Sequence, residues 1–100
     1  MDPDRSRFEH LYVETSVACG RLVPRFRLWM ALREAGADPD RLRRRDALAF
    51  CERGLADFLA AEGLALSRWR RRRLVRAVRF FDPATTTPEE ILARIDGEHA

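Results

Sequence analysis

The 100-residue sequence contains no lysine, only two cysteines and two histidines, and no apolar run longer than a handful of residues. The short apolar runs predict that no segment spans a membrane. Two cysteines, Cys19 and Cys51, are too few for a disulfide framework, and both fall on apolar helical faces where free cysteine acts as a small hydrophobe. The first ten residues, MDPDRSRFEH, are acidic and polar, unlike a signal peptide. We therefore expect a cytoplasmic protein with reduced thiols.

The supply of catalytic and metal-binding side chains is equally small. His10 and Cys19 are nine residues apart, which places them on opposite sides of a helix, and the other histidine is His99. The sequence has no Cys-x-x-Cys, His-Glu-x-x-His or Glu-x-x-His motif and no glycine-rich phosphate loop. Neither histidine is placed to activate a nucleophile. We therefore expect a protein that is not an enzyme, with no catalytic residue, metal or cofactor and no evident small-molecule substrate.

The patterning that is present is helical. Residues 1–100 form one domain by length, and a hydrophobic fraction of 46% is normal for a globular chain. No useful period-two alternation appears, so we predict no sheet. Apolar residues instead recur with a period near 3.6, which predicts an all-α, compact bundle of four to five helices. The expected ranges are about 3–23, 25–35, 39–62, 68–81 and 88–96.

Capping residues set several of these boundaries. Start signals stand at Asp2-Pro3, Asp38-Pro39, Ser67 and Thr87-Pro88, and stop signals at Gly36 and Gly63. Gly54 is the exception, because it falls inside the expected 39–62 helix, where it costs up to about 1 kcal/mol relative to alanine. A close approach by another backbone would explain its presence there.

Some apolar residues lie off the main buried faces. Phe26 and Met30 lie nearly opposite Leu28 and Leu32 in the second expected helix, which makes that helix either central in the bundle or a contact surface for a partner. The other residues of this kind are Val13 and Val17, which form a second, smaller apolar spot on the first helix, and Phe50 in the third. If Phe26, Met30, Val13, Val17 and Phe50 converge on one exposed patch, the patch is a protein interface for a partner or a homodimer.

The densest feature of the sequence is the stretch 67–81, SRWRRRRLVRAVRFF, which carries seven arginines and no acid. On a helical projection its apolar residues share one broad face: Leu74, Val75, Ala77, Val78 and Phe81. Four arginines fall opposite, with Trp69 and Phe80 beside them: Arg68, Arg72, Arg76 and Arg79. A guanidinium is a planar fork of donors that matches phosphate oxygens, and an adjacent tryptophan can stack on a base.

These properties predict a nucleic-acid-binding surface. The candidate residues are Arg68, Trp69, Arg72, Arg73, Arg76 and Arg79, extended by Arg43, Arg44 and Arg45 if the turn at Gly63 brings both basic runs to one side. We expect contact with the DNA or RNA backbone that is independent of sequence and strongly dependent on salt. We expect this contact to be with the backbone of a duplex or of structured RNA, and not first with specific bases.

Two other interpretations remain open. Arginine is the only strongly basic residue type of this chain, as in proteins of GC-rich genomes, and a charge run is often a solvated helix face. Residues 64–81 carry +7, residues 82–100 carry −4 from one arginine and five acids, and residues 1–63 are neutral. An acidic tail that folds back through Glu89, Glu90 or Asp96 would neutralise the helix. In the other interpretation, the basic helix binds an acidic protein partner.

Overall fold

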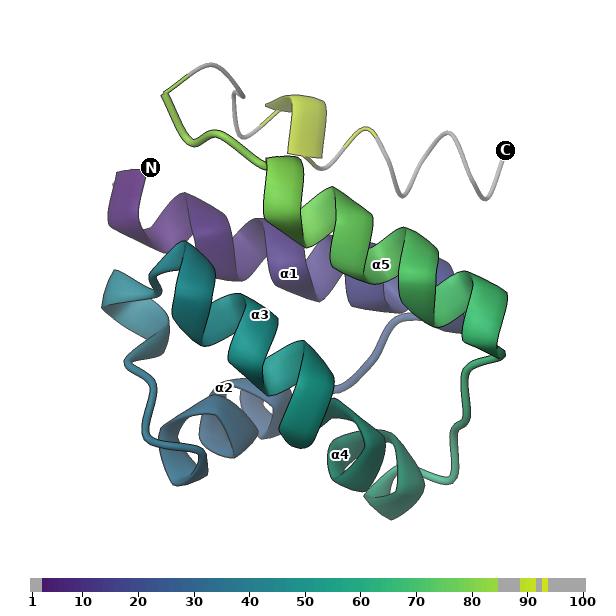
Figure 1. Ribbon diagram of the computed structural model, residues 1–100. Helices are drawn as coiled ribbons and strands as arrows, with labels where there is room; N and C mark the ends of the chain where they lie inside the picture. Colours follow the sequence, from purple (N-terminus) through teal and green to yellow (C-terminus); the bar gives the residue numbers. More distant parts are fainter. Residues whose placement is uncertain (1–2, 85–88, 92, 94–100) are drawn as a thin grey trace.

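The described residues contain five complete α-helices, one 3-10 turn and no strand (Figure 1). The computed structural model describes residues 3–84, 89–91 and 93. The elements are α1 (Pro3–Cys19), α2 (Arg25–Glu34), η1 (Pro39–Arg41), α3 (Arg44–Arg53), α4 (Leu55–Ala61) and α5 (Arg68–Phe80). This architecture confirms the all-α helical bundle that the sequence predicts.

The helices enclose one main core. α1 and α5 lie side by side and run in opposite directions, α3 packs against α5, and α2 and α4 lie on the far side of α3 (Figure 1). Leu11, Leu28, Leu55 and Leu74, from four different helices, are almost completely inaccessible to solvent and belong to the same apolar cluster. α5 is therefore fixed along one side to the body of the fold.

α1 is buried on two sides. Leu11 faces the main core, whereas Val13 joins Phe81 and Ile91 in a second, smaller cluster. Glu14 is buried as well, although the sequence places it on the far side of the helix, opposite the main apolar stripe. Val13 is therefore not part of an exposed protein interface, because the end of α5 and the helical residues 89–91 cover that side of α1. α1 is thus a central helix of the bundle.

Gly20 stops α1 at Cys19, four residues before the predicted boundary at Val23. Its φ of 75° is a left-handed conformation that glycine adopts without strain. The Gly20 N–H donates to the carbonyl of Val17, and the Arg21 N–H donates to the carbonyl of Ser16, both over 3.2 Å. This pair of bonds is a Schellman motif, which satisfies carbonyls that the helix end would leave unpaired.

The predicted helix at 39–62 is three elements in the structure. Asp38 caps η1 as expected, accepting a hydrogen bond from the Asp40 N–H over 3.0 Å. Leu42 and Arg43 are then extended, with ψ of 125° and 156°, so α3 begins only at Arg44. Leu42 is buried at 4% exposure. The helix is therefore interrupted at Leu42 and Arg43, and the Leu42 side chain is buried at this interruption.

Gly54 separates α3 from α4. A Cβ built at this position would lie 2.9 Å from Cδ1 of Phe50, closer than real contacts allow. The close neighbour is therefore a side chain one turn earlier, and not another backbone as the sequence suggests. Phe50 itself is only 3% exposed, so it belongs to the core and leaves the candidate protein interface.

The last predicted helix, 88–96, is described only in part. Residues 89–91 and 93 are helical, and Ile91 is 2% exposed in the cluster with Val13 and Phe81. The start signal at Thr87-Pro88 and the acid Asp96 lie outside the described residues.

Cys51 gives the core a pH dependence. Burial raises the pKa of the Cys51 thiol from its ordinary value of 9.0 to about 12, with the nearby Arg71 opposing this shift. The unfolded chain therefore releases the thiol proton at lower pH than the folded chain does. Stability is unaffected by this thiol below about pH 9 and falls as pH rises from there toward 12, by at most about 1.4 kcal/mol per pH unit.

We predict that Cys51→Ala flattens this alkaline loss. Urea unfolding of both chains from pH 7 to pH 11 measures it, and Cys19→Ala, at a half-buried thiol whose pKa burial also raises, should flatten the loss less than Cys51→Ala does. Equal slopes in the original chain and Cys51→Ala would show that Cys51 does not cause the alkaline loss.

Candidate nucleic-acid interface

α5 begins and packs as its sequence predicts. The Ser67 Oγ accepts a hydrogen bond from the Arg70 N–H over 3.2 Å, which caps the first turn. Leu74 and Val78 are 2% and 1% exposed against the core. The helix itself carries seven arginines and no acid, and like charges three and four residues apart repel each other. Burial of its apolar face therefore stabilises α5 against its own charge.

Two of the seven arginines hold α5 to other helices. Arg70 donates from Nη1 to the carbonyl of Ala18 over 2.9 Å, and Arg71 donates from Nη2 to the carbonyls of Cys51 and Glu52, both over 3.0 Å. These carbonyls belong to the last turns of α1 and α3, where helix carbonyls have no partner in their own helix. A cation at this end also interacts favourably with the helix dipole. Arg70 and Arg71 are thus structural caps.

We predict that Arg71→Met lowers the free energy of unfolding by about 1.5–3 kcal/mol, since it removes charge-assisted bonds to two carbonyls. The matched control is Arg72→Met, the next residue along, which is exposed and has no hydrogen bond or ion pair with the described chain. Its change should stay within about 0.5 kcal/mol. Urea unfolding measures both, and equal losses would contradict the capping role of Arg71.

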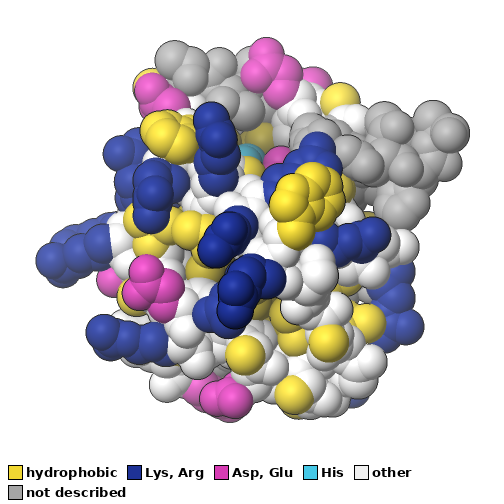
Figure 2. All heavy atoms as spheres, turned by 45° about the vertical axis from the view of Figure 1, so that its right-hand side comes forward, with side chains coloured by type: hydrophobic (Ala, Val, Ile, Leu, Met, Phe, Trp, Pro, Cys, Tyr) yellow, Lys and Arg dark blue, Asp and Glu magenta, His cyan; other side chains and the backbone are white. Residues whose placement is uncertain are grey.

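The remaining five arginines of α5 are exposed to solvent: Arg68, Arg72, Arg73, Arg76 and Arg79. No ion pair joins any of them to an acid in the part of the chain that the structure describes, Glu89 included. A shallow hollow of about 700 Å³ lies along this side of α5 and is lined by Arg68, Arg72, Arg76 and Arg79. Glu52 is an acid on its wall. Figure 2 shows this side of the molecule, with arginine side chains spread across it and most acidic side chains toward its edges.

Two large aromatic side chains stand among these arginines. Trp69 is 66% exposed and Phe80 is 70% exposed. The Arg73 guanidinium carbon lies 5.6 Å from the centroid of the Trp69 ring, and that of Arg76 lies 5.9 Å from the centroid of Phe80. These distances are typical of cation–π contacts. Each aromatic ring therefore has a cationic side chain next to it on the exposed side of α5.

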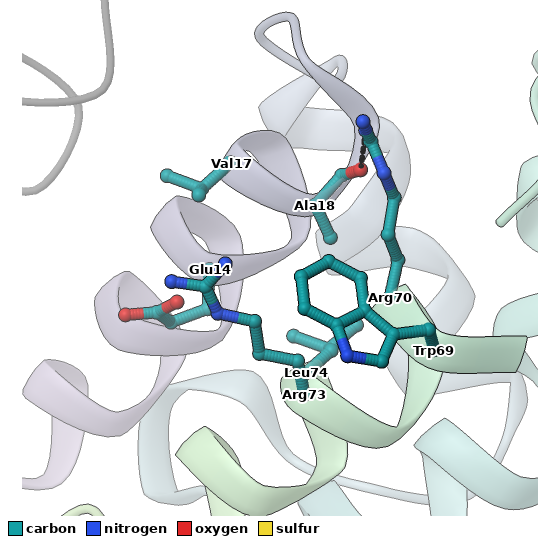
Figure 3. Close-up of a pocket in the computed structure, with 7 residues that line it drawn as sticks. All are labelled: Glu14, Val17, Ala18, Trp69, Arg70, Arg73 and Leu74. Carbon is teal, nitrogen blue, oxygen red and sulfur yellow. Dashed lines mark hydrogen bonds between the residues drawn. The ribbon is translucent and has the colours of Figure 1, made fainter. Parts of the chain in front are cut away.

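A small pocket of about 120 Å³ opens beside Trp69, between α1 and α5 (Figure 3). Val17, Ala18 and Leu74 form its apolar wall, and Arg70, held to the Ala18 carbonyl, lies at one end. Arg73 extends from α5 toward α1, where Glu14 also lines the pocket. The Glu14 carboxylate lies 3.8 Å from Nε2 of His10. The sequence gives no sign of this pocket, because its two walls are more than fifty residues apart.

The second basic run, Arg43 to Arg45, lies near the C-terminal end of α5, opposite the end that carries Trp69. Arg44 donates from Nη2 to the carbonyl of Phe81 over 3.3 Å, so the start of α3 adjoins the end of α5. Burial and the nearby Arg44 guanidinium lower the pKa of Arg7, while Asp82 opposes them. Arg45 lies 4.0 Å from the carboxylate of Asp46. Arg43 and Arg45 are exposed, and Arg44 is engaged as a cap of α5.

The candidate protein interface is reduced to fewer residues. Phe26 and Met30 are 71% and 38% exposed on α2, where the ring of Phe26 stacks on that of Trp29 at 6.0 Å. Val17 is half-buried and lines the pocket beside Trp69. Val13 and Phe50 are buried. The five residues therefore do not form one exposed patch.

The chain matches no protein-family model, no curated protein and no solved structure. Among the described residues, no group of three or more histidine, cysteine or acidic side chains is arranged to hold a metal ion. No helix in the same part of the chain has the length and hydropathy needed to cross a bilayer.

Proposed function

We propose that this chain is a non-enzymatic nucleic-acid-binding module that contacts the phosphate backbone through α5. The observation that carries the proposal is the row of four exposed guanidinium groups, on Arg68, Arg72, Arg76 and Arg79, that no acid of the described chain pairs with. Within the described residues, no acid neutralises this charge, which supports its use in binding an outside anion. A small subunit of a larger nucleoprotein assembly would have these properties.

The interface favours a phosphate chain over a single small anion. The arginines occupy four positions along twelve residues of helix, so they present donors over a length of about 16 Å. Phosphates on a nucleic acid repeat along such a length, and each guanidinium can donate two bonds to one of them. Contacts of this kind position the ligand without reading its sequence.

Salt dependence is the direct test of this proposal. If four phosphates are neutralised, the logarithm of the association constant falls with the logarithm of salt concentration with a slope of about −3 to −4. Fluorescence anisotropy of labelled DNA and RNA at several sodium chloride concentrations measures the slope. Association that is weak and indifferent to salt would overturn the proposal.

The second candidate function is a protein-interaction adaptor or homo-oligomer. The exposed, stacked side chain of Phe26 and the neighbouring Met30 favour it, because large apolar side chains are often exposed where a partner covers them. In that case light scattering gives a mass above the 11.6 kDa of one chain. The double change Phe26→Ser with Met30→Ser would then return the mass to that of a monomer. A monomer that binds nucleic acid would leave only the first proposal standing.

A further inference from the structure

The exposed aromatic residues and two of the arginines lie on one line along α5. Trp69, Arg73, Arg76 and Phe80 follow a spacing of four, three and four residues, which keeps them on a single face of a helix. Eleven residues of α-helix turn about three times and rise about 16 Å. The two rings therefore stand at opposite ends of the same ridge, with two guanidinium groups between them.

The rings are available for a ligand with flat faces. Trp69 and Phe80 are each about two-thirds exposed, and the nearest cations, Arg73 and Arg76, stack on them and leave most of each ring open to solvent. In a duplex the base faces are stacked inside the helix, and a protein meets only base edges and the backbone. Only unpaired bases offer a face to an aromatic side chain. The ridge is thus suited to a single strand.

A second row of charge runs beside the ridge. Arg68, Arg72 and Arg79 lie about 60–100° around the helix from the aromatic line, on its exposed side, and Arg76 lies between this row and the ridge, where it can contact a phosphate as well. A single strand turns its bases to one side and its phosphates to the other. Bases on the ridge and phosphates on the row are compatible with one strand lying along α5.

The pocket beside Trp69 supports the same ligand. It has the room of about four water molecules, which a single planar ring can replace. Its wall includes the buried carboxylate of Glu14, which repels a phosphate but accepts hydrogen bonds from ring or exocyclic N–H groups. The apolar side chains of Val17 and Leu74 complete the wall. Arg70 and Arg73 line the pocket as well, so it offers both hydrogen-bond donors and an acceptor beside an apolar wall, as the edge of a planar base requires.

We infer that α5 binds single-stranded nucleic acid, with unpaired bases stacked on Trp69 and Phe80 and the phosphates on the neighbouring arginine row. This inference rests on the proposed function and narrows it, because the proposed function alone is satisfied by backbone contact with a duplex. The ridge replaces the expectation of a duplex ligand that follows from the arginines alone.

The test uses a single-stranded oligonucleotide of about 12 nucleotides, the matching duplex, and phosphatidylserine vesicles. Trp29→Phe removes the other tryptophan, which stacks on Phe26 away from α5, so that Trp69 alone reports by fluorescence. We expect the single strand to quench Trp69 and to bind at least about tenfold more tightly than the duplex. Trp69→Ala should weaken single-strand binding about 5- to 150-fold and leave duplex binding unchanged, while Trp69→Phe should restore most of the loss.

The outcomes separate the two proposals. Equal binding of single strand and duplex, unaffected by Trp69→Ala, overturns the inference and leaves the proposed function intact. Binding to neither nucleic acid overturns both, and binding to the vesicles alone would identify an anionic membrane surface as the ligand instead. Circular dichroism of Trp69→Ala, at an exposed position, ensures that any loss reflects the contact and not unfolding.

Discussion

Reversing the charge of Arg72 and Arg76 together is expected to lower the affinity for nucleic acid at least about hundredfold at about 0.1 M salt. Each charge-assisted contact to a phosphate contributes about 1.5 kcal/mol or more, and two lost contacts give this factor before any repulsion is added. Both side chains are exposed on the middle turns of α5, so Arg72→Glu with Arg76→Glu leaves the buried face of the helix unchanged. Fluorescence anisotropy of a labelled oligonucleotide measures the loss.

The control carries the same change in net charge at a different place. Arg33 and Arg41 are exposed on α2 and η1, and neither forms an ion pair with another described residue. Arg33→Glu with Arg41→Glu should reduce affinity by only a few-fold, through the weakened overall field. If both double variants lose affinity equally, the binding depends on net charge and has no defined surface on α5.

The amphipathic character of α5 could be read from the sequence because it depends on local spacing. Ser67 caps its first turn, Leu74 and Val78 are buried, and the arginines of the opposite face are exposed, as predicted. A helical period and a capping hydroxyl act within a few residues of each other. The sequence therefore contains all the information that they require.

The roles of individual arginines could not be read in this way. Arg70, Arg71 and Arg44 cap the ends of other helices through contacts that span 52, 20 and 37 residues. Within the sequence they are indistinguishable from the arginines beside them. Only the packing of α5 across the ends of α1 and α3 decides which cations are structural and which remain available to a ligand.

The misplaced apolar residues have a related cause. The helical projections of the sequence assume one buried face for most helices, whereas Val13 is covered by the second cluster around Phe81. Phe50 turns into the core where Gly54 leaves room for its ring. Both cases depend on what packs against a helix from elsewhere in the chain. Periodicity alone does not report a second covering element.

The attachment of α5 to the core leads to the largest expected effect on stability. Leu74→Ala should lower the free energy of unfolding by about 2–5 kcal/mol, since it removes a side chain that is 2% exposed and leaves a cavity. A domain of this size has about 5–15 kcal/mol in total. Leu22→Ala is the matched control, because Leu22 is 58% exposed and its loss should cost less than about 0.5 kcal/mol. Urea unfolding measures both, and similar losses would contradict the role of Leu74.

The Leu74 variant also connects the stability of α5 with its proposed ligand. A polyanion that binds only the folded helix stabilises the chain by about 2.7 kcal/mol at a concentration of 100 times Kd. An excess of oligonucleotide should therefore raise the melting temperature of the original chain and of Leu74→Ala, but not that of Arg72→Glu with Arg76→Glu. Equal stabilisation of the charge-reversed chain would mean that the oligonucleotide binds elsewhere. The apolar and the charged faces belong to one helix. Loss of Leu74 from the apolar face therefore lowers the fraction of molecules in which α5 is folded, but it leaves the arginines of the folded helix unchanged.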